Sequence, residues 1–470
     1  MRNRIAKRVR RIQSDLSQKA RRLASRSGMK FEPKVALLNP HSSVNVSAGK
    51  RRMIVVGGSL GSNAIGRAYM LADLAAADFA VEIVGTLLPS RGRNLWKPLK
   101  DANIPIRGFV ADDMISYLSG ACSLVRSSPC EIVYVSKPRF SGFFIGMLLS
   151  MKNNCPLLLD IDDLELSFAK NRLPLAFDQL AAEFRLEPAQ IDNLASAMWI
   201  RFSETLVGEA DAITLSNESL QTRYDGALLR HARDETQFIP DEARRRAMRQ
   251  ELGIRDDQKA VLFVGTPQPH KGLDKIAAIF SAREDDRIVL CIVGAENNSA
   301  VREKLGIRNT RNVHFFPAQS FARLPDLIRA GDAVCLLQDS SSMISEFQIP
   351  AKLSESLALG LPVLASRVTP FAGLIASGAI TPIDNNEDLR RALDDICTKP
   401  EDPLICARRR ELFLSEFSYA ANRPRLLRAT HLAEACHAKA PHRRNAAIEQ
   451  IAQCFASQFG IDVLQSIRKA

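Results

Sequence analysis

Short apolar runs alternate with helical segments from Met53 onward, and this alternation restricts the possible folds of the chain more than any other feature. Runs that are apolar throughout are typical of strands buried on both faces of a parallel sheet, with helices in the crossovers. The expected strands fall into two blocks, Met53–Gly57, Ala80–Gly85, Glu131–Val135, Pro156–Asp160 and Asp211–Leu215, then Ala260–Gly265, Arg287–Val293, Val313–Phe316, Asp332–Leu337 and Pro362–Ser366. Two such blocks predict an α/β fold of two Rossmann-like domains that face a cleft, with ligands at the carboxyl ends of the strands.

The length of 470 residues is sufficient for two domains and additional helices. We expect a basic arm and linker over residues 1–52, a first domain over 53–240, a second domain over 241–410 and C-terminal helices over 411–470. The linker is expected from Asn39 to Arg52, where apolar residues are few. A polar helical segment at 241–256 is expected to act as the hinge between the domains.

Positive charge is concentrated in the arm. The net charge is +12, and residues 1–52 carry 15 Lys/Arg against Asp15 and Glu32, so the rest of the chain is nearly neutral. Apolar residues recur there at steps of three or four, which predicts a basic amphipathic helix over residues 2–26. Such a helix can lie on an anionic membrane surface, gaining about 1 kcal/mol for each Lys/Arg near the surface. Nucleic acid, the body of the protein and a second subunit are the alternative partners.

The nine cysteines are scattered and never spaced as Cys-x-x-Cys, which favours reduced thiols over disulfides or zinc. No apolar run approaches the roughly 20 residues that a bilayer requires. The sequence begins without the apolar region of a secretory signal. We therefore expect a cytoplasmic protein, with attachment to the inner face of the cell membrane as an alternative.

Two motifs in the second block suggest a nucleotide site. Lys271 lies in a loop between a strand and a helix, and a lysine beside a helix N-terminus favours phosphate, although a solvated lysine is the alternative. Glu355 lies in a helix that stops at Gly360 and is followed at once by an apolar strand. A carboxylate there can accept hydrogen bonds from both hydroxyls of a ribose, unless it is simply an exposed helix residue.

These motifs resemble the nucleotide-binding half of retaining glycosyltransferases of the two-Rossmann-domain (GT-B) kind, within glycosyltransferase family 4. Lys271-Gly272, Glu355 and Gly360-Leu361-Pro362-Val363-Leu364-Ala365 stand at the family's Lys-Gly, ribose-binding Glu and Gly-x-Pro-Val-x-Ala positions. The match extends over roughly residues 53–410. The resemblance implies Lys271 and Glu355 as the catalytic residues. The implied donor site comprises Gly265, Thr266, Lys271, Gly272, Ile349, Lys352 and Glu355.

The chain departs from the family at two positions. Thr266 stands where the family often has arginine. Phe347 stands at the first acid of the usual Glu-x7-Glu pair, with Glu346 one residue out of register. Whether Glu346 or the backbone of the loop 345–349 holds the sugar instead is left open, as is whether Lys352 contacts an anion or is only solvated.

The first block supplies candidates for the acceptor or sugar side of the cleft. Asp160-Ile161-Asp162-Asp163-Leu164-Glu165 ends an apolar strand and is the densest group of acids, which could bind a metal, cap a helix or recognise hydroxyls. Arg233 could face the phosphates or pair with Asp234. The resemblance implies a sugar-side set of Gly58, Ser59, Lys137, Asp162, Asp163, Glu165 and Arg233. We expect neither a metal nor a cofactor, and the absence of an acid after Gly85 argues against NAD.

The predicted function is therefore retaining transfer of a sugar from a nucleoside diphosphate sugar to a glycan or lipid-linked acceptor, in cell-surface polysaccharide biosynthesis. Because many family members act on lipid-linked acceptors, the membrane interpretation of the arm is favoured and nucleic acid is disfavoured. In the family a late helix crosses back onto the first domain, and Glu411–His437 is the expected counterpart. A sugar-nucleotide epimerase on the same fold and a non-catalytic nucleotide-sugar sensor or membrane scaffold are the alternative functions.

Overall fold

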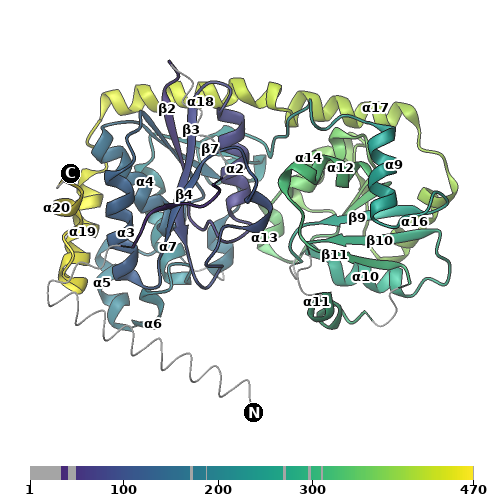
Figure 1. The fold of residues 1–470 in the computed structure, drawn as a ribbon, viewed down its shortest axis with the longest axis horizontal. Helices are drawn as coiled ribbons and strands as arrows, with labels where there is room; N and C mark the ends of the chain where they lie inside the picture. Colours follow the sequence, from purple (N-terminus) through teal and green to yellow (C-terminus); the bar gives the residue numbers. More distant parts are fainter. Residues whose placement is uncertain are drawn as a thin grey trace, which may run out of the picture.

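The structure is a computed structural model that describes residues 33–40, 49–169, 173–186, 188–267, 271–294, 298–307 and 311–468. It contains two α/β domains side by side, bridged along one edge by helices from the end of the chain (Figure 1). Each domain has its own largely parallel sheet, so the predicted fold class is confirmed. The predicted arm helix over residues 2–26 lies outside the described residues.

The first domain contains an eight-stranded sheet in the order β1-β4-β3-β2-β5-β6-β7-β8, parallel except where β1 pairs with β4. The central strands β5 and β6 are buried along their whole length, as expected for strands covered on both faces. The strands are β1 Ala36–Leu37, β2 Arg52–Gly57, β3 Ala80–Leu87, β4 Ile106–Val110, β5 Ile132–Ser136, β6 Leu157–Ile161, β7 Ala212–Leu215 and β8 Ala227–Leu228. The helices are α2 Ile65–Ala75, η1 Lys97–Leu99, α3 Met114–Arg126, α4 Phe140–Asn153, η2 Glu165–Ala169, α5 Phe177–Leu186, α6 Pro188–Ile191, α7 Ala197–Thr205, η3 Val207–Glu209 and α8 Glu218–Gln221.

The second domain contains a six-stranded parallel sheet in the order β11-β10-β9-β12-β13-β14. Its strands are β9 Lys259–Val264, β10 Ile288–Val293, β11 Val313–Phe316, β12 Ala333–Leu336, β13 Val363–Ala365 and β14 Thr381–Pro382. Its helices are α9 Glu242–Glu251, α10 Leu273–Ser281, α11 Asn298–Lys304, η5 Phe321–Arg323, α12 Leu324–Arg329, α13 Met343–Glu346, α14 Ala351–Ala358, η6 Thr369–Phe371, α15 Ala372–Ala376, α16 Asn386–Thr398 and α17 Pro403–Leu412. The sheet reverses its strand order between β9 and β12, which is where ligands bind in open α/β sheets.

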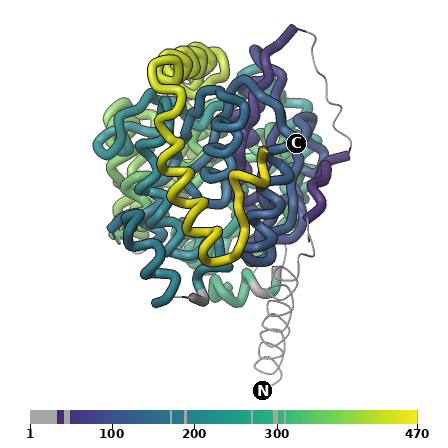
Figure 2. Tube along the Cα trace, turned by 90° about the vertical axis from the view of Figure 1, so that its left-hand side faces the viewer, coloured from purple at the N-terminus to yellow at the C-terminus, as the bar shows by residue number. Residues whose placement is uncertain are grey.

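The chain returns to the first domain after α17. A π-helical turn, η7 Phe413–Phe417, leads into α18 Tyr419–Lys439, whose apolar residues join the first-domain core beside α2. The last helices, α19 Asn445–Phe459 and α20 Val463–Arg468, run along the outside of the same domain (Figure 2). The predicted crossing helix is therefore present. None of the described helices is both long and apolar enough to pass through a membrane.

Two sequence expectations are wrong in detail. Asn39, expected to begin a linker, is fully buried, and its amide donates to the carbonyl oxygens of Ala102 and Ile104 because a buried side-chain amide needs partners. The expected hinge at 241–256 contains α9, which packs on α12 and so belongs to the body of the second domain. The ten predicted strands all occur, and all nine cysteines are free thiols, five of them buried.

Candidate active site

The loop after β9 is held in place by glycines. Gly265 and Gly272 have positive φ angles of 130° and 60°, which side chains other than glycine rarely adopt. A Cβ atom on Gly272 would lie 1.9 Å from the carbonyl oxygen of Leu337, just after β12. Gly272 therefore lets the Lys271 loop lie directly on the end of β12 and caps the N-terminus of α10. This explains why glycine follows lysine in the sequence motif.

Two lysines, Lys271 and Lys352, converge beside this loop. Lys271 Nζ donates to the carbonyl oxygen of Thr266 at 3.0 Å, and Lys352 Nζ lies 4.8 Å from the centre of the Phe263 ring. Neither lysine forms an ion pair with a described residue. Burial, followed by the charge of Lys352, lowers the pKa of Lys271 to about 7, and burial also lowers the pKa of Lys352. Two partly buried cations that repel each other form a site for an anion.

Glu355 faces the linker between the domains from α14. Its side chain is 4% exposed, and Oε1 accepts hydrogen bonds from Arg233 Nη2 at 2.5 Å and Nε at 3.2 Å. The expected pairing of Arg233 with Asp234 is not seen, because Asp234 bonds to Thr236 and Gln237 instead. Glu355 Oε2 receives no hydrogen bond from a described residue. It is also not among the described side-chain atoms that are fully buried and lack a hydrogen-bond partner.

A cavity of about 710 Å³ opens between the domains at the carboxyl ends of β9 and β10. Gly265 and Thr266 line it from the second domain, while Gly61 and Trp96 line it from the first. Phe321, also in the lining, has its ring centre 5.3 Å from that of Tyr69 and 5.9 Å from that of Trp96. The lining is largely apolar with few polar groups, which suits a nucleoside-sized ligand.

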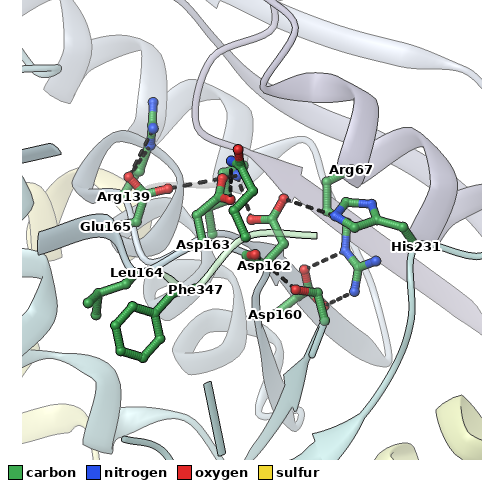
Figure 3. Close-up of polar contacts among 12 residues, drawn as sticks. Arg67, Arg139, Asp160, Asp162, Asp163, Leu164, Glu165, His231 and Phe347 are labelled. Carbon is green, nitrogen blue, oxygen red and sulfur yellow. Dashed lines mark hydrogen bonds and ion pairs between the residues drawn. The ribbon is translucent and has the colours of Figure 1, made fainter. Parts of the chain in front are cut away.

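The first domain contributes a buried cluster of charges opposite the second domain (Figure 3). Lys137 Nζ lies 2.5 Å from Asp162 Oδ1, 2.6 Å from Asp163 Oδ2 and 3.8 Å from Glu165 Oε1. Lys137 has a φ angle of 72°, an unfavourable conformation for a residue with a side chain, which the cluster holds in place. Arg139 neutralises Glu165 at 2.9 Å.

The cluster already contains its own cation. Asp162, Asp163 and Glu165 form the group of described residues whose ligand atoms lie within 4.8 Å of one another, close enough for a metal ion. The Lys137 ammonium takes the place between these carboxylates that a metal ion would need. The three acids do not cap the short helix that follows, since their carboxylates accept hydrogen bonds from Lys137, Arg139 and Gln348.

The acids of the cluster differ in proton affinity. Burial raises the pKa of Asp162 to about 7, against the opposing charge of Lys137. Asp163 is also buried, but Lys137 and the Gln348 hydrogen bond hold its pKa well below the usual range. His231 Nε2 lies 3.9 Å from Asp162 Oδ2, and burial together with Arg67 and Arg233 lowers the pKa of this imidazole far below 6.5. The cleft therefore contains a neutral imidazole beside a carboxyl group that titrates near neutrality.

Two consecutive residues of the second domain attach it to this cluster. Phe347 packs against the first-domain core, and its carbonyl oxygen accepts a hydrogen bond from Asn217 at 3.0 Å. Gln348 Nε2 donates to Asp163 Oδ1 at 2.6 Å. The position where the family has its first acid is thus an apolar contact between domains. Glu346 does not take the place of this first acid beside the cluster. Its carboxylate accepts a hydrogen bond from Thr369 Oγ1 instead.

The structure brings most of the predicted site residues together at the cleft and places a few elsewhere. Ile349 is 3% exposed and lies in the second-domain core, so its side chain does not face the cleft. Gly58 accepts a hydrogen bond from Ser141 through its carbonyl oxygen, and Ser59 bonds to Ser62. Sequence reasoning missed His231, Gln348, Trp96 and Phe321 as cleft residues, because nothing in their local pattern distinguishes them from packing residues.

Part of the chain is similar to known proteins. Residues 244–411 match the family model of the glycosyl transferases group 1. The chain is 31% identical over 115 residues to the putative colanic acid biosynthesis glycosyl transferase WcaI of Escherichia coli K12, covering 24% of this chain and 28% of WcaI. It is 32% identical over 165 residues to the lipopolysaccharide glucosyltransferase WaaG of the same strain, covering 32% of this chain and 41% of WaaG. The chain thus spans less than half the length of these relatives.

A solved structure shares the whole fold. The crystal structure of Anabaena HepE in complex with UDP and glucose superposes with a TM-score of 0.59 at 15% identity, covering 81% of this chain and 99% of HepE. The fold is that of the GT-B glycosyltransferases. The match to the group 1 glycosyl transferases thus lies within the second domain.

Proposed function

We propose that the protein transfers a sugar from a nucleoside diphosphate sugar to a glycan or lipid-linked acceptor, with retention of the anomeric configuration. The observation that carries this proposal is the pair of partly buried lysines, Lys271 and Lys352, at the point where the second sheet reverses its strand order. Neither lysine forms an ion pair with a described residue, and burial lowers the pKa of both. A diphosphate is the natural counterion for two such lysines beside a helix N-terminus.

The remaining features match the other parts of such a donor. The nucleoside would occupy the cavity lined by Val293 and Phe321, and the ribose would bond to Glu355 Oε2. Lys271 and Lys352 would stabilise the negative charge that develops on the leaving diphosphate, which is electrostatic catalysis by preorganised groups. Closure of the cleft around the donor would exclude water and limit hydrolysis.

The acceptor would enter from the first-domain side. The acids Asp162, Asp163 and Glu165 lie on that side, beside the second-domain residue Gln348, and carboxylates accept hydrogen bonds from sugar hydroxyls. The names of WcaI and WaaG, which refer to colanic acid and lipopolysaccharide, support an acceptor in cell-surface polysaccharide assembly. A cytoplasmic location and contact of residues 2–26 with an anionic membrane remain predictions from the sequence.

The first test is binding. Thermal shifts with UDP, GDP, ADP and their common sugars, without added metal, should reveal one preferred nucleotide. The shift should vanish in Lys271→Ala and Lys352→Ala but persist in Lys275→Ala, an exposed lysine on the same helix as the phosphate site. No shift for any nucleotide at millimolar concentration, even after Mg²⁺ is added, would contradict the proposal.

The second test is turnover. Incubation of the preferred nucleotide sugar with a panel of glycan and lipid-linked acceptors should release free nucleoside diphosphate only when the acceptor is present. Release without an acceptor, or interconversion of the sugar itself, would indicate the epimerase alternative. Tight binding without turnover on any acceptor would favour the sensor or scaffold. NMR of the product would show whether the anomeric configuration is retained.

A further inference from the structure

Arg233 holds Glu355 in one orientation from the linker between the domains. Both Nη2 and Nε donate to the same oxygen, Oε1, at 2.5 and 3.2 Å, while Nη1 donates to the carbonyl oxygen of Ala232 at 2.9 Å. Each nitrogen of this guanidinium therefore donates at least one hydrogen bond, and the residue is only 7% exposed. Arg233 thus directs two of its three nitrogens to the Glu355 carboxylate.

The backbone of Arg233 is as firmly held as its side chain. Its N–H donates to the carbonyl oxygen of Phe417 at 2.9 Å, and its own carbonyl accepts from the N–H of Tyr419 at 3.0 Å. These bonds join the two places where the chain crosses between the domains, the linker before α9 and the turn before α18. Because its backbone is held on both sides, Arg233 is well placed to orient the carboxylate that it binds.

The hydrogen bonds leave a defined part of the carboxylate unused. An ionised carboxylate has two oxygens and about four lone-pair positions. Arg233 donates to Oε1 only, so Oε2 stays available to another donor. Two adjacent hydroxyls of a ribose are the donor set that the two lone pairs of Oε2 can accept together.

The same guanidinium also contacts the wall of the nucleoside cavity. Arg233 Cζ lies 5.9 Å from the centre of the Phe321 ring, and Phe321 lines the cavity and packs against Tyr69 and Trp96 of the first domain. One buried residue, Arg233, thus contacts both the Glu355 carboxylate and the wall of the cavity. If Arg233 is replaced, the Glu355 side chain can adopt more rotamers. Its connection through Arg233 to Phe321 in the cavity wall is lost as well.

We propose that Arg233 is a positioning residue that orients Glu355 toward both ribose hydroxyls, so that the site demands a ribonucleotide donor. This inference rests on the proposed function, since it assumes that a nucleotide binds in the cleft. It goes further by naming the residue through which the ribose requirement is enforced. Glu355 touches the ribose, and Arg233 acts only through Glu355.

The test compares a ribonucleoside diphosphate with its 2′-deoxy counterpart, using the base selected by the thermal-shift panel. The wild type should bind the ribonucleotide at least about tenfold more tightly, the effect of one lost hydrogen bond to a charged group. Arg233→Gln should bring the ratio of the two affinities close to that of Glu355→Ala. Arg233→Lys, which keeps the charge and one donor, should recover part of the ratio.

The ratio separates positioning from a general structural role, because misfolding would weaken both nucleotides equally. A ribose preference that stays intact in Arg233→Gln and Arg233→Lys would overturn the inference while leaving the donor site in place. Absence of nucleotide binding in the wild type would refute the proposed function itself. If Arg233→Gln does not fold, Arg233→Lys alone decides: an unchanged ratio overturns the inference and a reduced ratio supports it.

Discussion

The charge state of Lys271 makes donor binding depend on pH. Without a ligand the pKa of Lys271 is about 7, because burial and the nearby Lys352 oppose its charged form. A bound diphosphate favours the ammonium and raises this pKa, so above pH 7 each donor must bring a proton with it. Each pH unit above 7 then weakens binding about tenfold, or about 1.4 kcal/mol, until the pKa of the bound state is reached. At pH 9 the loss is roughly fiftyfold relative to pH 7, where half of the lysine is already neutral.

Isothermal titration calorimetry with an intact nucleotide sugar measures this pH dependence directly. The diphosphate of such a donor is a diester that does not ionise between pH 6 and 9, so the protein alone sets the slope of affinity against pH. Lys271→Arg is the matched control, because arginine stays charged at every pH used. This variant should bind the donor with a much flatter profile from pH 6 to 9. Proton uptake should also appear as a binding enthalpy that depends on the buffer.

A wild-type affinity that does not change between pH 7 and 9 would refute the reasoning, because it would show that Lys271 is fully charged in the empty cleft. An equal slope in Lys271→Arg would assign the titration to another group of the cleft, either Lys352, whose pKa burial also lowers, or Asp162, whose pKa is about 7. Below pH 7 the affinity should be constant, since the ammonium is then present with or without the donor.

Three further substitutions test the packing around the cleft. Lys137→Met should lower the free energy of unfolding, measured by denaturant unfolding, by about 3–5 kcal/mol at pH 8. The loss should be smaller at pH 5, where the carboxylates left without a cation can take up protons. A loss below about 1 kcal/mol at pH 8 would contradict the role of this lysine as the cluster's cation. Gly272→Ala should abolish the nucleotide-induced thermal shift, because its Cβ would collide with a backbone carbonyl. Gly253→Ala is the control, because Gly253 has a similar φ angle of 66° but open space around it. This variant should keep the shift and lose only about 1–2 kcal/mol of stability. Phe321→Ala should weaken donor binding and increase the radius of gyration in small-angle scattering, and unchanged values of both would exclude a role in closing the cleft.

The sheet strands could be predicted because burial on both faces leaves a strong apolar signal. The strands that sequence reasoning missed, β1, β4, β8 and β14, are short or lie toward the edge of their sheet. Strand β4 contains Gly108 and Arg107, whose guanidinium pairs with Glu82 on the neighbouring strand. Such a strand has no continuous apolar run, and only its neighbours in space reveal it.

The candidate site was predictable where function depends on a local motif. Lys271-Gly272 and Glu355 stand in sequence patterns whose geometry is set within one loop or one helix. The pairing of Glu355 with Arg233 joins residues 122 positions apart and could not be read from either segment alone. Phe347 appeared in the sequence as a missing acid, yet the structure gives it a positive role as an apolar contact with the other domain.

The core of the first domain is completed by residues that are synthesised last. Phe455, near the end of the chain, packs at 6.0 Å against Phe140 in the first-domain core, and the buried Arg444 bonds to Asp211 at the base of β7. The domain that leaves the ribosome first therefore lacks part of its interior until the last helices emerge. During that interval an apolar surface around Trp199 and Phe144 stays uncovered, which makes the nascent first domain a natural client for chaperones.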